Sequence, residues 1–439
     1  MSDPQPLPVA TVDSPAAERD RPGPGTARIL AGAGVGNMLE WFDWSVYAIF
    51  ATFFAAQFFV DDGAFGAILS TLAIFAVGFL MRPLGGFLFG WVADRRGRRF
   101  AMTTSMMMMA GGSLLIGLAP THAAIGAWAG VLLVVARLVQ GLAHGGEIAA
   151  SYTYVAEIAP RERRGLWSTT VYVSVTAGVL GASLVGAAAA TIFGADELRE
   201  WAWRIPFLIG GLLGVVGLYL RRSLEETAAF RATDATPTTL RQLAADLSRN
   251  RASLLRTIGL TAGITVVYYV WAVGISGFAI STRGVDPTHA LWATVVANLV
   301  FMATLPLWGL LSDRVGRRPV YVFYGAAMAV IAFPLLALLN DSAVRMGLLM
   351  TVALVLMGAF NGNMPAYFAE LFPTEVRASG VGIGSSLTVA LLGGSAPYLL
   401  TWLSSRDLEW VFGLYTVVLA LVGLVTALLS PETKGNDLR

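Results

Sequence analysis

The sequence has no cysteine, one lysine (Lys434) and three histidines in 439 residues. Without cysteine the chain has no disulfide, no thiol nucleophile and no thiolate metal ligand. The histidines are not spaced for shared coordination, so we expect no metal site and no other cofactor. Charged residues make up only 13% of the chain, against about 25% in soluble domains. An ordinary water-soluble enzyme is therefore not expected.

Further absences exclude other classes of protein. No basic tract is interleaved with aromatic residues, so we expect no nucleic-acid partner. No Gly-x-x-x-x-Gly-Lys-Ser/Thr loop is present to bind a nucleotide phosphate, and no pattern suggests an intramembrane enzyme. Residues 1–26 lack the basic stretch and short apolar core of a cleavable signal peptide. They are rich in proline and poor in apolar residues, so we expect a disordered tail.

Long apolar runs are what the chain has in abundance, since 56% of its residues are hydrophobic. A membrane-spanning helix needs roughly 20 mostly apolar residues. We therefore predict an all-α integral membrane protein with twelve transmembrane helices. The predicted spans are residues 27–56, 65–93, 100–118, 124–158, 166–192, 203–220, 257–280, 289–311, 319–339, 343–371, 379–403 and 409–429.

The distribution of arginine predicts the orientation of these spans. Turns after the even-numbered spans carry most of the arginines, and the opposite turns carry few. By the positive-inside rule the rich turns and both termini are cytoplasmic. The rich turns hold Arg95, Arg96, Arg98, Arg99, Arg161, Arg163, Arg164, Arg221, Arg222, Arg314, Arg317 and Arg318, and the opposite turns hold mainly Arg199, Arg283, Arg345 and Arg406.

The chain also contains an internal repeat. The pattern Gly-x-x-x-Asp-Arg-x-Gly-Arg-Arg occurs at 90–99 and again at 309–318, and Ala-Glu-x-x-Pro-x-Glu-x-Arg occurs at 156–164 and 369–377. Two parallel six-helix bundles are therefore expected, with alternating access to a site between them. The expected boundaries are a disordered cytoplasmic tail (1–26), a first bundle (27–220), a central cytoplasmic loop (221–256), a second bundle (257–430) and a cytoplasmic tail (431–439).

The duplicated turn resembles the signature of the major facilitator superfamily. More specific segments resemble its metabolite:proton symporter family, and the similarity covers about residues 30–430. Known members of that family carry 2-oxoglutarate, citrate, shikimate, or proline and betaine, and the second half looks closest to the organic-acid permeases. The segments are Gly36–Asp43, Gly78–Gly86, Gln140–Glu147, Trp203–Phe207, Leu224–Thr227, Ala369–Pro373 and Gly393–Pro397.

Charged residues within the predicted spans are the candidate chemistry. Each costs about 2.5 to 3.5 kcal/mol at mid-bilayer, so they must face a wet cavity or one another. Those in the first half are Glu40, Asp43, Arg82, Arg137 and Glu147. At 100° per residue, Arg137, Gln140, His144, Glu147 and Ser151 share one face of the predicted fourth span.

Four side chains are candidates for proton coupling: Glu147, Asp43, Glu40 and His144. The resemblance favours Glu147, because it lies in the family's Gly-Gly-Glu motif. A permanent structural pair with Arg137 or Arg82 is the alternative for that carboxylate. His144 has a suitable intrinsic pKa for switching near neutrality, but a hydrogen-bonded histidine in a polar core remains open.

Seven side chains are candidates for substrate binding: Arg82, Arg137, Arg204, Tyr268, Tyr269, Asn361 and Asn363. The planar guanidinium of Arg82 is suited to a carboxylate, although pairing with Asp43 or Glu147 is equally open. Arg204 would attract anions at the outer entrance or anchor the helix at the headgroups. The two tyrosines would contact substrate or only pack. Pro365 should kink the tenth span and expose a carbonyl to a cavity.

The resemblance implies that the duplicated turns form gates. Asp94 would pair with arginines of its motif and with a helix N-terminus of the opposite half, and Glu157 would join through Arg98 or Arg99. Asp313 with Arg317 would form the weaker counterpart. Retention of the arginines for topology alone is the other interpretation.

We therefore expect proton-driven uptake of a small organic acid, most simply a dicarboxylate such as 2-oxoglutarate, across the inner membrane. A symporter of zwitterions such as proline or betaine is the second hypothesis. A membrane sensor that binds its solute without moving it is the third, from another class. The expected partners are the solute, protons and lipid, and the chain is expected to work as a monomer.

Overall fold

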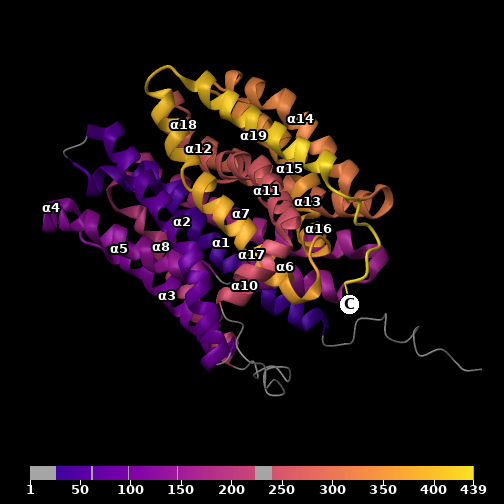
Figure 1. Cartoon of the computed structure of the whole chain (residues 1–439). Coiled ribbons are helices and arrows are strands. Elements are labelled where there is room, and N and C mark those ends of the chain that lie inside the picture. Colours follow the sequence, from indigo (N-terminus) through magenta and orange to yellow (C-terminus); the bar gives the residue numbers. More distant parts are fainter. Residues whose placement is uncertain (1–25, 61–62, 97, 146, 223–239, 439) are drawn as a thin grey trace, which may run out of the picture.

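The computed structural model describes residues 26–60, 63–96, 98–145, 147–222 and 240–438, and over these ranges its regular elements are all helices. Figure 1 shows that the indigo and magenta helices of the first half gather on one side of the molecule and the orange and yellow helices of the second half on the other. The all-helical prediction is therefore confirmed.

The first bundle contains six spans. The fourth is divided in two, and α4 (His122–Ile125), η1 (Arg161–Arg163) and η2 (Leu198–Ala202) are short connecting turns. The spans are α1 (Thr26–Phe58), α2 (Gly63–Arg96), α3 (Arg98–Leu118), α5 (Trp128–His144) with α6 (Glu147–Ile158), α7 (Arg164–Glu197) and α8 (Arg204–Arg222).

The second bundle also contains six spans. It is preceded by α10 (Leu240–Arg249), and η4 (Thr374–Val376) is a connecting turn. Its spans are α11 (Arg251–Tyr268) continuing through η3 (Tyr269–Gly274) into α12 (Ile275–Arg283), α13 (Pro287–Val315), α14 (Arg317–Ala337), α15 (Ala343–Asn361) with α16 (Met364–Glu370), α17 (Arg377–Thr388) continuing through η5 (Val389–Gly393) into α18 (Ala396–Ser404), and α19 (Glu409–Leu429).

These helices have the length and surface of membrane spans. Eight of them are long and apolar enough to cross a bilayer, and three further apolar helices are shorter; with α1 they make the twelve predicted spans. Large apolar side chains such as Trp128, Val330 and Val344 are exposed on the outer surface. Soluble proteins rarely expose large apolar patches, whereas lipid covers them in a membrane protein. The chain is a multi-pass membrane protein.

Two predicted spans are broken near the middle of the molecule. The span expected as one helix over 124–158 is divided, because α5 ends at His144 and α6 starts at Glu147. The tenth span ends α15 at Asn361 and resumes at Met364, which confirms the expected kink at Pro365. The single helix with one continuous polar stripe is therefore corrected to two helices, with Arg137, Gln140 and His144 on the first.

Glycines bring α2 and α5 into backbone contact. A Cβ atom on Gly141 would lie 2.1 Å from the carbonyl oxygen of Gly78, and one on Gly85 would lie 1.9 Å from that of Leu142. No side chain fits in either place, since real Cβ contacts do not come closer than about 3 Å. This approach holds Arg82 on α2 against the polar face of α5.

The segments outside the bundles contain more ordered structure than the sequence predicted. α10 lies inside the expected central loop, and α11 begins at Arg251, ahead of the predicted start of its span. Residues 1–25, and with them most of the predicted disordered tail, lie outside the described ranges. Residues 431–438 pack against the protein: Figure 1 places the C-terminus beside α6 and α16, and Leu438 forms an apolar contact cluster with Ala156 and Ala369.

Candidate functional site

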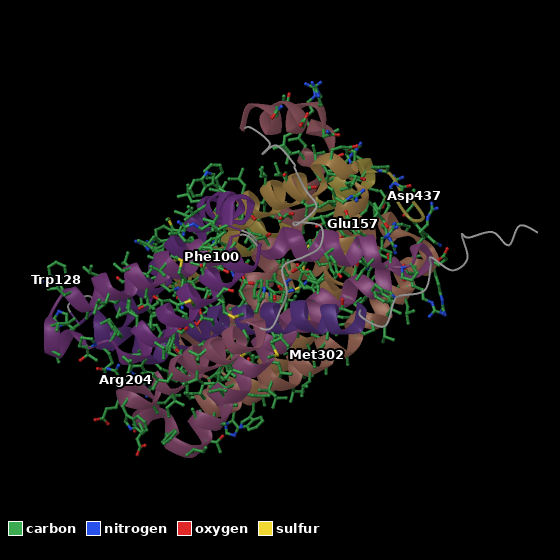
Figure 2. All side chains as sticks on the ribbon, turned by 90° about the horizontal axis from the view of Figure 1, so that it is seen from below. Phe100, Trp128, Glu157, Arg204, Met302 and Asp437 are labelled. Carbon is green, nitrogen blue, oxygen red and sulfur yellow. The ribbon has the colours of Figure 1, made fainter. Side chains whose placement is uncertain are left out.

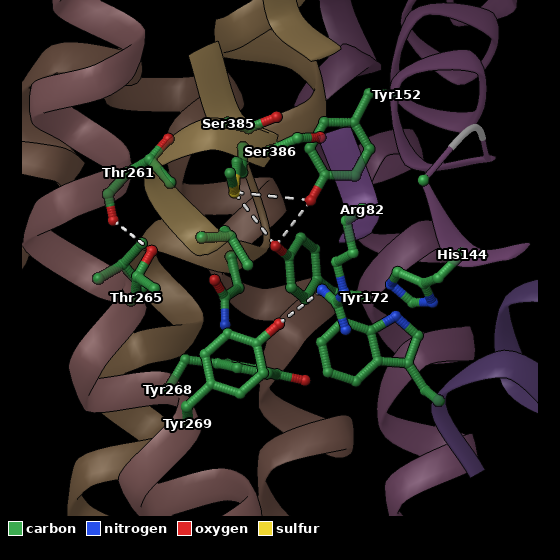
Figure 3. A pocket seen from close by; sticks show the side chains of 16 residues that line it. Arg82, His144, Tyr152, Tyr172, Thr261, Thr265, Tyr268, Tyr269, Ser385 and Ser386 are labelled. Carbon is green, nitrogen blue, oxygen red and sulfur yellow. Dashed lines mark hydrogen bonds between the residues drawn. The ribbon is translucent and has the colours of Figure 1, made fainter. Parts of the chain in front are cut away.

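A cavity lies between the two bundles and takes its walls from both (Figure 3). The first bundle contributes α1, α2, α5, α6 and α7, and the second contributes α11, η3, α15, α16, α17 and η5. Most of the polar groups on the wall are hydroxyls. The lining residues are Trp41, Arg82, His144, Gly145, Tyr152, Tyr172, Thr261, Ile264, Thr265, Tyr268, Tyr269, Asn361, Met364, Ser385, Ser386 and Val389.

Arg82 is the arginine of this wall, and its side chain is buried. Nη1 donates a hydrogen bond to the hydroxyl of Tyr269, at 3.2 Å, across the bundle interface. The guanidinium carbon lies 3.8 Å from the ring centroid of Phe79 and 4.2 Å from that of Trp44. Nε and Nη2 have no hydrogen-bond partner in the described part of the chain. These two nitrogens form one edge of the fork that binds a carboxylate in a bidentate manner.

Glu40 and His144 meet beside this arginine. The Glu40 carboxylate contacts Nδ1 of His144, and both residues are at most 2% exposed. The imidazole lies edge-on to the rings of Trp44 and Trp41, with centroids 5.4 Å and 6.1 Å away. The structure thus brings together two of the four proton-coupling candidates.

Asp43 belongs to a second polar cluster, which we call the coupling cluster: Asp43, Ser113, Arg137 and Gln140. The Gln140 amide donates to Asp43 Oδ2, at 2.7 Å, and to the Ser113 hydroxyl, at 3.2 Å. Its carbonyl oxygen accepts from Arg137 Nη1, at 2.9 Å. The cluster is buried and does not belong to the cavity wall. Gln140 therefore links the carboxylate to the guanidinium where no direct pair forms in the described chain.

Some of the remaining substrate-binding candidates line the cavity, and others lie outside it. Tyr268, Tyr269 and Asn361 line the cavity, and the rings of Trp41 and Tyr268 are 5.4 Å apart. Asn363 donates instead to the carbonyls of Ala359, at 3.1 Å, and Trp308, at 3.4 Å.

Arg204 and Arg137 are not part of the wall either. Arg204 donates to the carbonyls of Gly117 and Ala119, and its guanidinium carbon lies 4.4 Å from the ring centroid of Trp203. Figure 2 shows Arg204 and Trp128 at one end of the molecule and Glu157 and Asp437 toward the other.

Hydroxyls and a thioether join the bundles at one side of the cavity. The Tyr152 and Tyr172 hydroxyls, both from the first bundle, are 2.7 Å apart. Each also lies against the sulfur of Met364, at 3.6 Å and 3.1 Å respectively. Met364 starts α16, directly after the break in the tenth span. A movement of that break therefore changes the wall of the cavity.

The duplicated turns form the inter-bundle ion cluster: Glu157, Arg164, Asp313, Arg317, Glu370 and Arg377. Arg164 pairs with Glu370 at 2.8 Å and Arg377 pairs with Glu157 at 2.6 Å, so each bundle's arginine reaches the other bundle's glutamate. Asp313 accepts from Arg317 at 2.7 Å and from the backbone N–H groups of Gly165 and Leu166. A carboxylate there also meets the positive end of α7.

The described partner of Glu157 is thus Arg377. The side chains of Glu147, Asp94, Arg98 and Arg99 lie outside the described part of the structure, so their predicted roles stay predictions. The structure also assigns contacts to residues that were not predicted as site residues. Arg164, Glu370 and Arg377 were readable from the repeat, whereas Trp44, Gln140 and Met364 had no comparable signal in the sequence.

The C-terminal segment adds to this cluster from outside. Glu432 accepts from the backbone N–H groups of Arg317 and Arg318, and the Thr433 hydroxyl donates to Glu370 at 2.6 Å. Arg164 donates to the carbonyl of Asn436, at 3.0 Å. The segment therefore contacts both bundles at the same end as the ion cluster.

Comparisons with known proteins agree with this geometry. The profile of the "Sugar (and other) transporter" family matches residues 30–236 and 230–439. An alpha-ketoglutarate permease of Escherichia coli K12 is 37% identical over 415 residues, covering 93% of this chain and 94% of the relative. A proline/betaine transporter of Salmonella typhimurium is 33% identical, covering 94% and 85%. A citrate-proton symporter of Klebsiella pneumoniae is 33% identical, covering 83% of each.

Solved structures show the same fold. A proton:xylose symporter of the major facilitator superfamily, with a bound bromodeoxyglucose, superposes with a TM-score of 0.74 at 18% identity, covering 93% of this chain and 97% of that one. With two matches of one transporter family, twelve spans in two bundles and a cavity between them, the chain belongs to the sugar (and other) transporter family of the major facilitator superfamily, and it is a transporter, not an enzyme.

Proposed function

We propose that this protein couples proton entry to the uptake of a small organic acid, with a dicarboxylate such as 2-oxoglutarate as the first candidate. The observation that carries the proposal is Arg82, which lines a cavity shared by both bundles and whose buried Nε and Nη2 have no hydrogen-bond partner among the described residues. Buried donors without acceptors are costly, and a substrate carboxylate supplies the acceptors. The relative at 37% identity is named for alpha-ketoglutarate.

A zwitterion such as betaine or proline is the second candidate, and a specific observation favours it. The rings of Trp41, Tyr268 and Tyr269 lie close to one another beside Arg82, with centroids 5.4 to 6.1 Å apart. Aromatic faces attract quaternary ammonium groups. An arginine for the carboxylate and rings for the ammonium would suit such a solute, and relatives at 33% identity are named for proline and betaine.

For proton coupling we propose the buried carboxylates of the first bundle. Asp43 is supported by its link to Arg137 through Gln140, and Glu40 by its contact with His144; Glu147 is supported by the family resemblance. One net charge moved through 100 mV supplies about 2.3 kcal/mol, and tenfold accumulation requires about 1.4 kcal/mol. The membrane gradients are then sufficient without a cofactor.

For the inter-bundle ion cluster we propose a gate on the cytoplasmic side of an inner-membrane protein whose termini are both inside. The arginine bias of the sequence supports that orientation. The pairs Arg164–Glu370 and Arg377–Glu157 join the two bundles at one end, so they must separate before the cavity opens there. A monomer suffices for this cycle, because both walls of the cavity come from one chain.

Uptake into proteoliposomes tests the function. The purified protein is reconstituted, a pH gradient is imposed, and labelled 2-oxoglutarate, citrate, shikimate, proline and betaine are offered separately. We expect 2-oxoglutarate to accumulate and a proton ionophore to abolish the accumulation. Accumulation of proline or betaine alone would establish the second candidate. Binding without uptake of any solute would instead indicate a sensor.

A further inference from the structure

Trp44 lies between the two buried arginines of the first bundle. Its ring centroid is 4.2 Å from the guanidinium carbon of Arg82 and 4.1 Å from that of Arg137. In the described part of the chain it is the one ring that contacts both. The two cations are therefore at most roughly 8 Å apart, within the screening length of about 8 to 10 Å that holds even in salt water.

The surroundings indicate that an indole is needed at this place. Trp44 is 1% exposed, and its ring N–H has no hydrogen-bond partner in the described chain. Burying an unpaired donor is unfavourable, and a phenyl ring would avoid that penalty. Indole is, however, the aromatic ring that attracts cations most strongly. On α2, Gly78 leaves space for it, since a Cβ there would lie 3.1 Å from Cη2 of Trp44.

The Trp44 ring lies between a buried cluster that holds a carboxylate and an arginine that lines the cavity. On one side is the coupling cluster, where Gln140 joins Asp43 to Arg137. On the other side is Arg82, which lines the cavity and whose Nε and Nη2 have no partner among the described residues. The other titratable groups around them are Tyr47 and Glu40 on α1, His144 on α5, Tyr268 on α11 and Tyr269 on η3, whose hydroxyl accepts from Arg82. Ser113 of α3 and Phe75 and Phe79 of α2 add no charge.

We propose that Trp44 is a positioning residue for coupled transport: its ring holds Arg82 and Arg137 in one stack, so that the charge of the coupling cluster sets the affinity of Arg82 for a substrate carboxylate. This inference rests on the proposed function and extends it to a residue that contacts neither proton nor solute. The indole supplies no charge. It fixes the distance between the two guanidinium groups, and this distance sets the strength of their electrostatic interaction.

The direction of the effect follows from the charges. A proton on Asp43 removes one negative charge, and the positive charge of Arg137 is then uncompensated. The potential at Arg82 becomes more positive, so an anion binds there more tightly. By linkage, the bound anion strengthens proton binding at Asp43 by the same factor. Proton and solute are then loaded together and released together, as symport requires.

Binding measurements on the full-length protein test the inference. The dissociation constants of 2-oxoglutarate and of glycine betaine are measured by titration calorimetry at mildly acidic and mildly alkaline pH, where both probes keep their carboxylates ionised. In the wild type we expect tighter binding at acidic pH, by about 5- to 150-fold, the usual range of coupling between sites. Trp44→Leu should bring this ratio close to one, and Trp44→Phe should retain part of it.

Phe53→Leu is the matched control, because Phe53 lies on the same helix, is similarly buried, and packs its ring on Phe50 rather than on a ring that contacts either arginine. It should keep the wild-type ratio. A wild-type ratio in Trp44→Leu, or an equal loss in Phe53→Leu, would overturn the inference. If Trp44→Leu fails to fold, Trp44→Phe decides alone: benzene attracts cations less than indole, so an unchanged ratio contradicts the proposal.

Failure of the proposed function is distinguishable from failure of this inference. If the wild type binds either probe with the expected pH ratio but shows no gradient-driven uptake, the transport proposal fails and the role of Trp44 stands. If the wild type accumulates solute and Trp44→Leu behaves identically, only the role of Trp44 fails. Absence of binding by both probes overturns both.

Discussion

The guanidinium of Arg82 has one nitrogen bonded to the opposite bundle and two nitrogens that are available to a solute. Nη1 donates to the Tyr269 hydroxyl of the opposite bundle, while the buried Nε and Nη2 have no partner among the described residues. A solute that binds the open edge therefore attaches to a side chain that already bridges the bundles. Binding and bundle position are linked through one planar group, which a flexible ammonium would not achieve.

Arg82→Lys should therefore weaken solute binding even though it keeps the charge. A lysine cannot form two parallel bonds to a carboxylate, and loss of one charge-assisted hydrogen bond of about 1.5 to 3 kcal/mol corresponds to about 10- to 100-fold in KM. The measurement is the KM for 2-oxoglutarate exchange in proteoliposomes. Arg283→Lys is the control, because Arg283 pairs with Glu409 and does not line the cavity; equal effects of the two variants would exclude a role for the Arg82 fork.

At this scale the sequence predicts charges better than neutral groups. The cost of burying a charge showed that Glu40, Asp43, Arg82 and Arg137 needed partners or water, and the structure gives all four buried polar contacts. Gln140 was visible only as a member of a polar face. Gln140 bridges Asp43 and Arg137 because of the distance between α1 and α5, and the sequence pattern does not give this distance.

At the scale of elements, the contact between α2 and α5 depends on glycine. Gly141 lies where a Cβ would overlap the Gly78 carbonyl oxygen, at 2.1 Å. The helices would have to move apart, and overpacking of this kind costs about 1 to 3 kcal/mol. Because Arg82 and Gln140 are carried by these two helices, separation would also disturb the site.

Gly141→Ala should consequently lower the melting temperature of the purified protein by several degrees, and solute binding should weaken with it. Gly111→Ala in α3 is the matched control, since a Cβ at Gly111 would meet nothing within 4 Å. It should be neutral or slightly stabilising, because alanine is the better helix former. Both are measured by thermal unfolding in detergent, with and without 2-oxoglutarate. Equal melting temperatures for the two variants would contradict the packing argument.

Hydropathy predicts the helices but not their interruptions. Twelve apolar runs are enough to place the spans, and Pro365 signals the break of the tenth. The division of the fourth span between His144 and Glu147 has no comparable signal in the sequence. The backbone of α2 approaches Gly145 there, since a Cβ on Gly145 would be 2.0 Å from the Arg82 carbonyl oxygen. Such an approach is a tertiary contact, which a local pattern of residues does not encode.

At the scale of the whole molecule, the repeat in the sequence becomes a pair of crossed contacts. Arg164 donates to the Ala156 carbonyl of its own bundle and pairs with Glu370 of the other. Arg377 does the same with Ala369 and Glu157. Two copies of one motif thus hold one another between the bundles. The duplication was visible in the sequence, but the crossed pairing was not predicted, since Glu157 was expected to join Arg98 or Arg99. The contacts of the C-terminal segment were not predicted, because residues 431–439 were expected to form only a cytoplasmic tail.

The crossed contacts are not equivalent in burial, and this difference leads to the last prediction. The Glu370 carboxylate is buried and also lies 3.5 Å from Arg317, whereas the side chain of Glu157 is 45% exposed. Removing one partner of a buried pair leaves an uncompensated charge and costs about 3 to 5 kcal/mol. The Glu157–Arg377 pair is half-exposed, because water reaches Glu157 while Arg377 is buried, and Arg377 keeps hydrogen bonds to Ala369, Thr374 and Leu438, so we expect a smaller loss there. Glu370→Gln should therefore favour separation of the bundles at this end far more than Glu157→Gln.

Because the natural chain has no cysteine, two spin labels can be attached without background. Cysteines introduced at the exposed Glu162 and Glu375 place one label on each bundle beside the ion cluster, and the distance between the labels is measured in reconstituted protein. In Glu370→Gln the distance distribution should shift to a longer component, since a change of about 3 kcal/mol or more can invert a two-state population. Glu157→Gln should leave it nearly unchanged. If both variants shift it equally, burial does not decide the strength of these contacts, and the closed end depends on other groups.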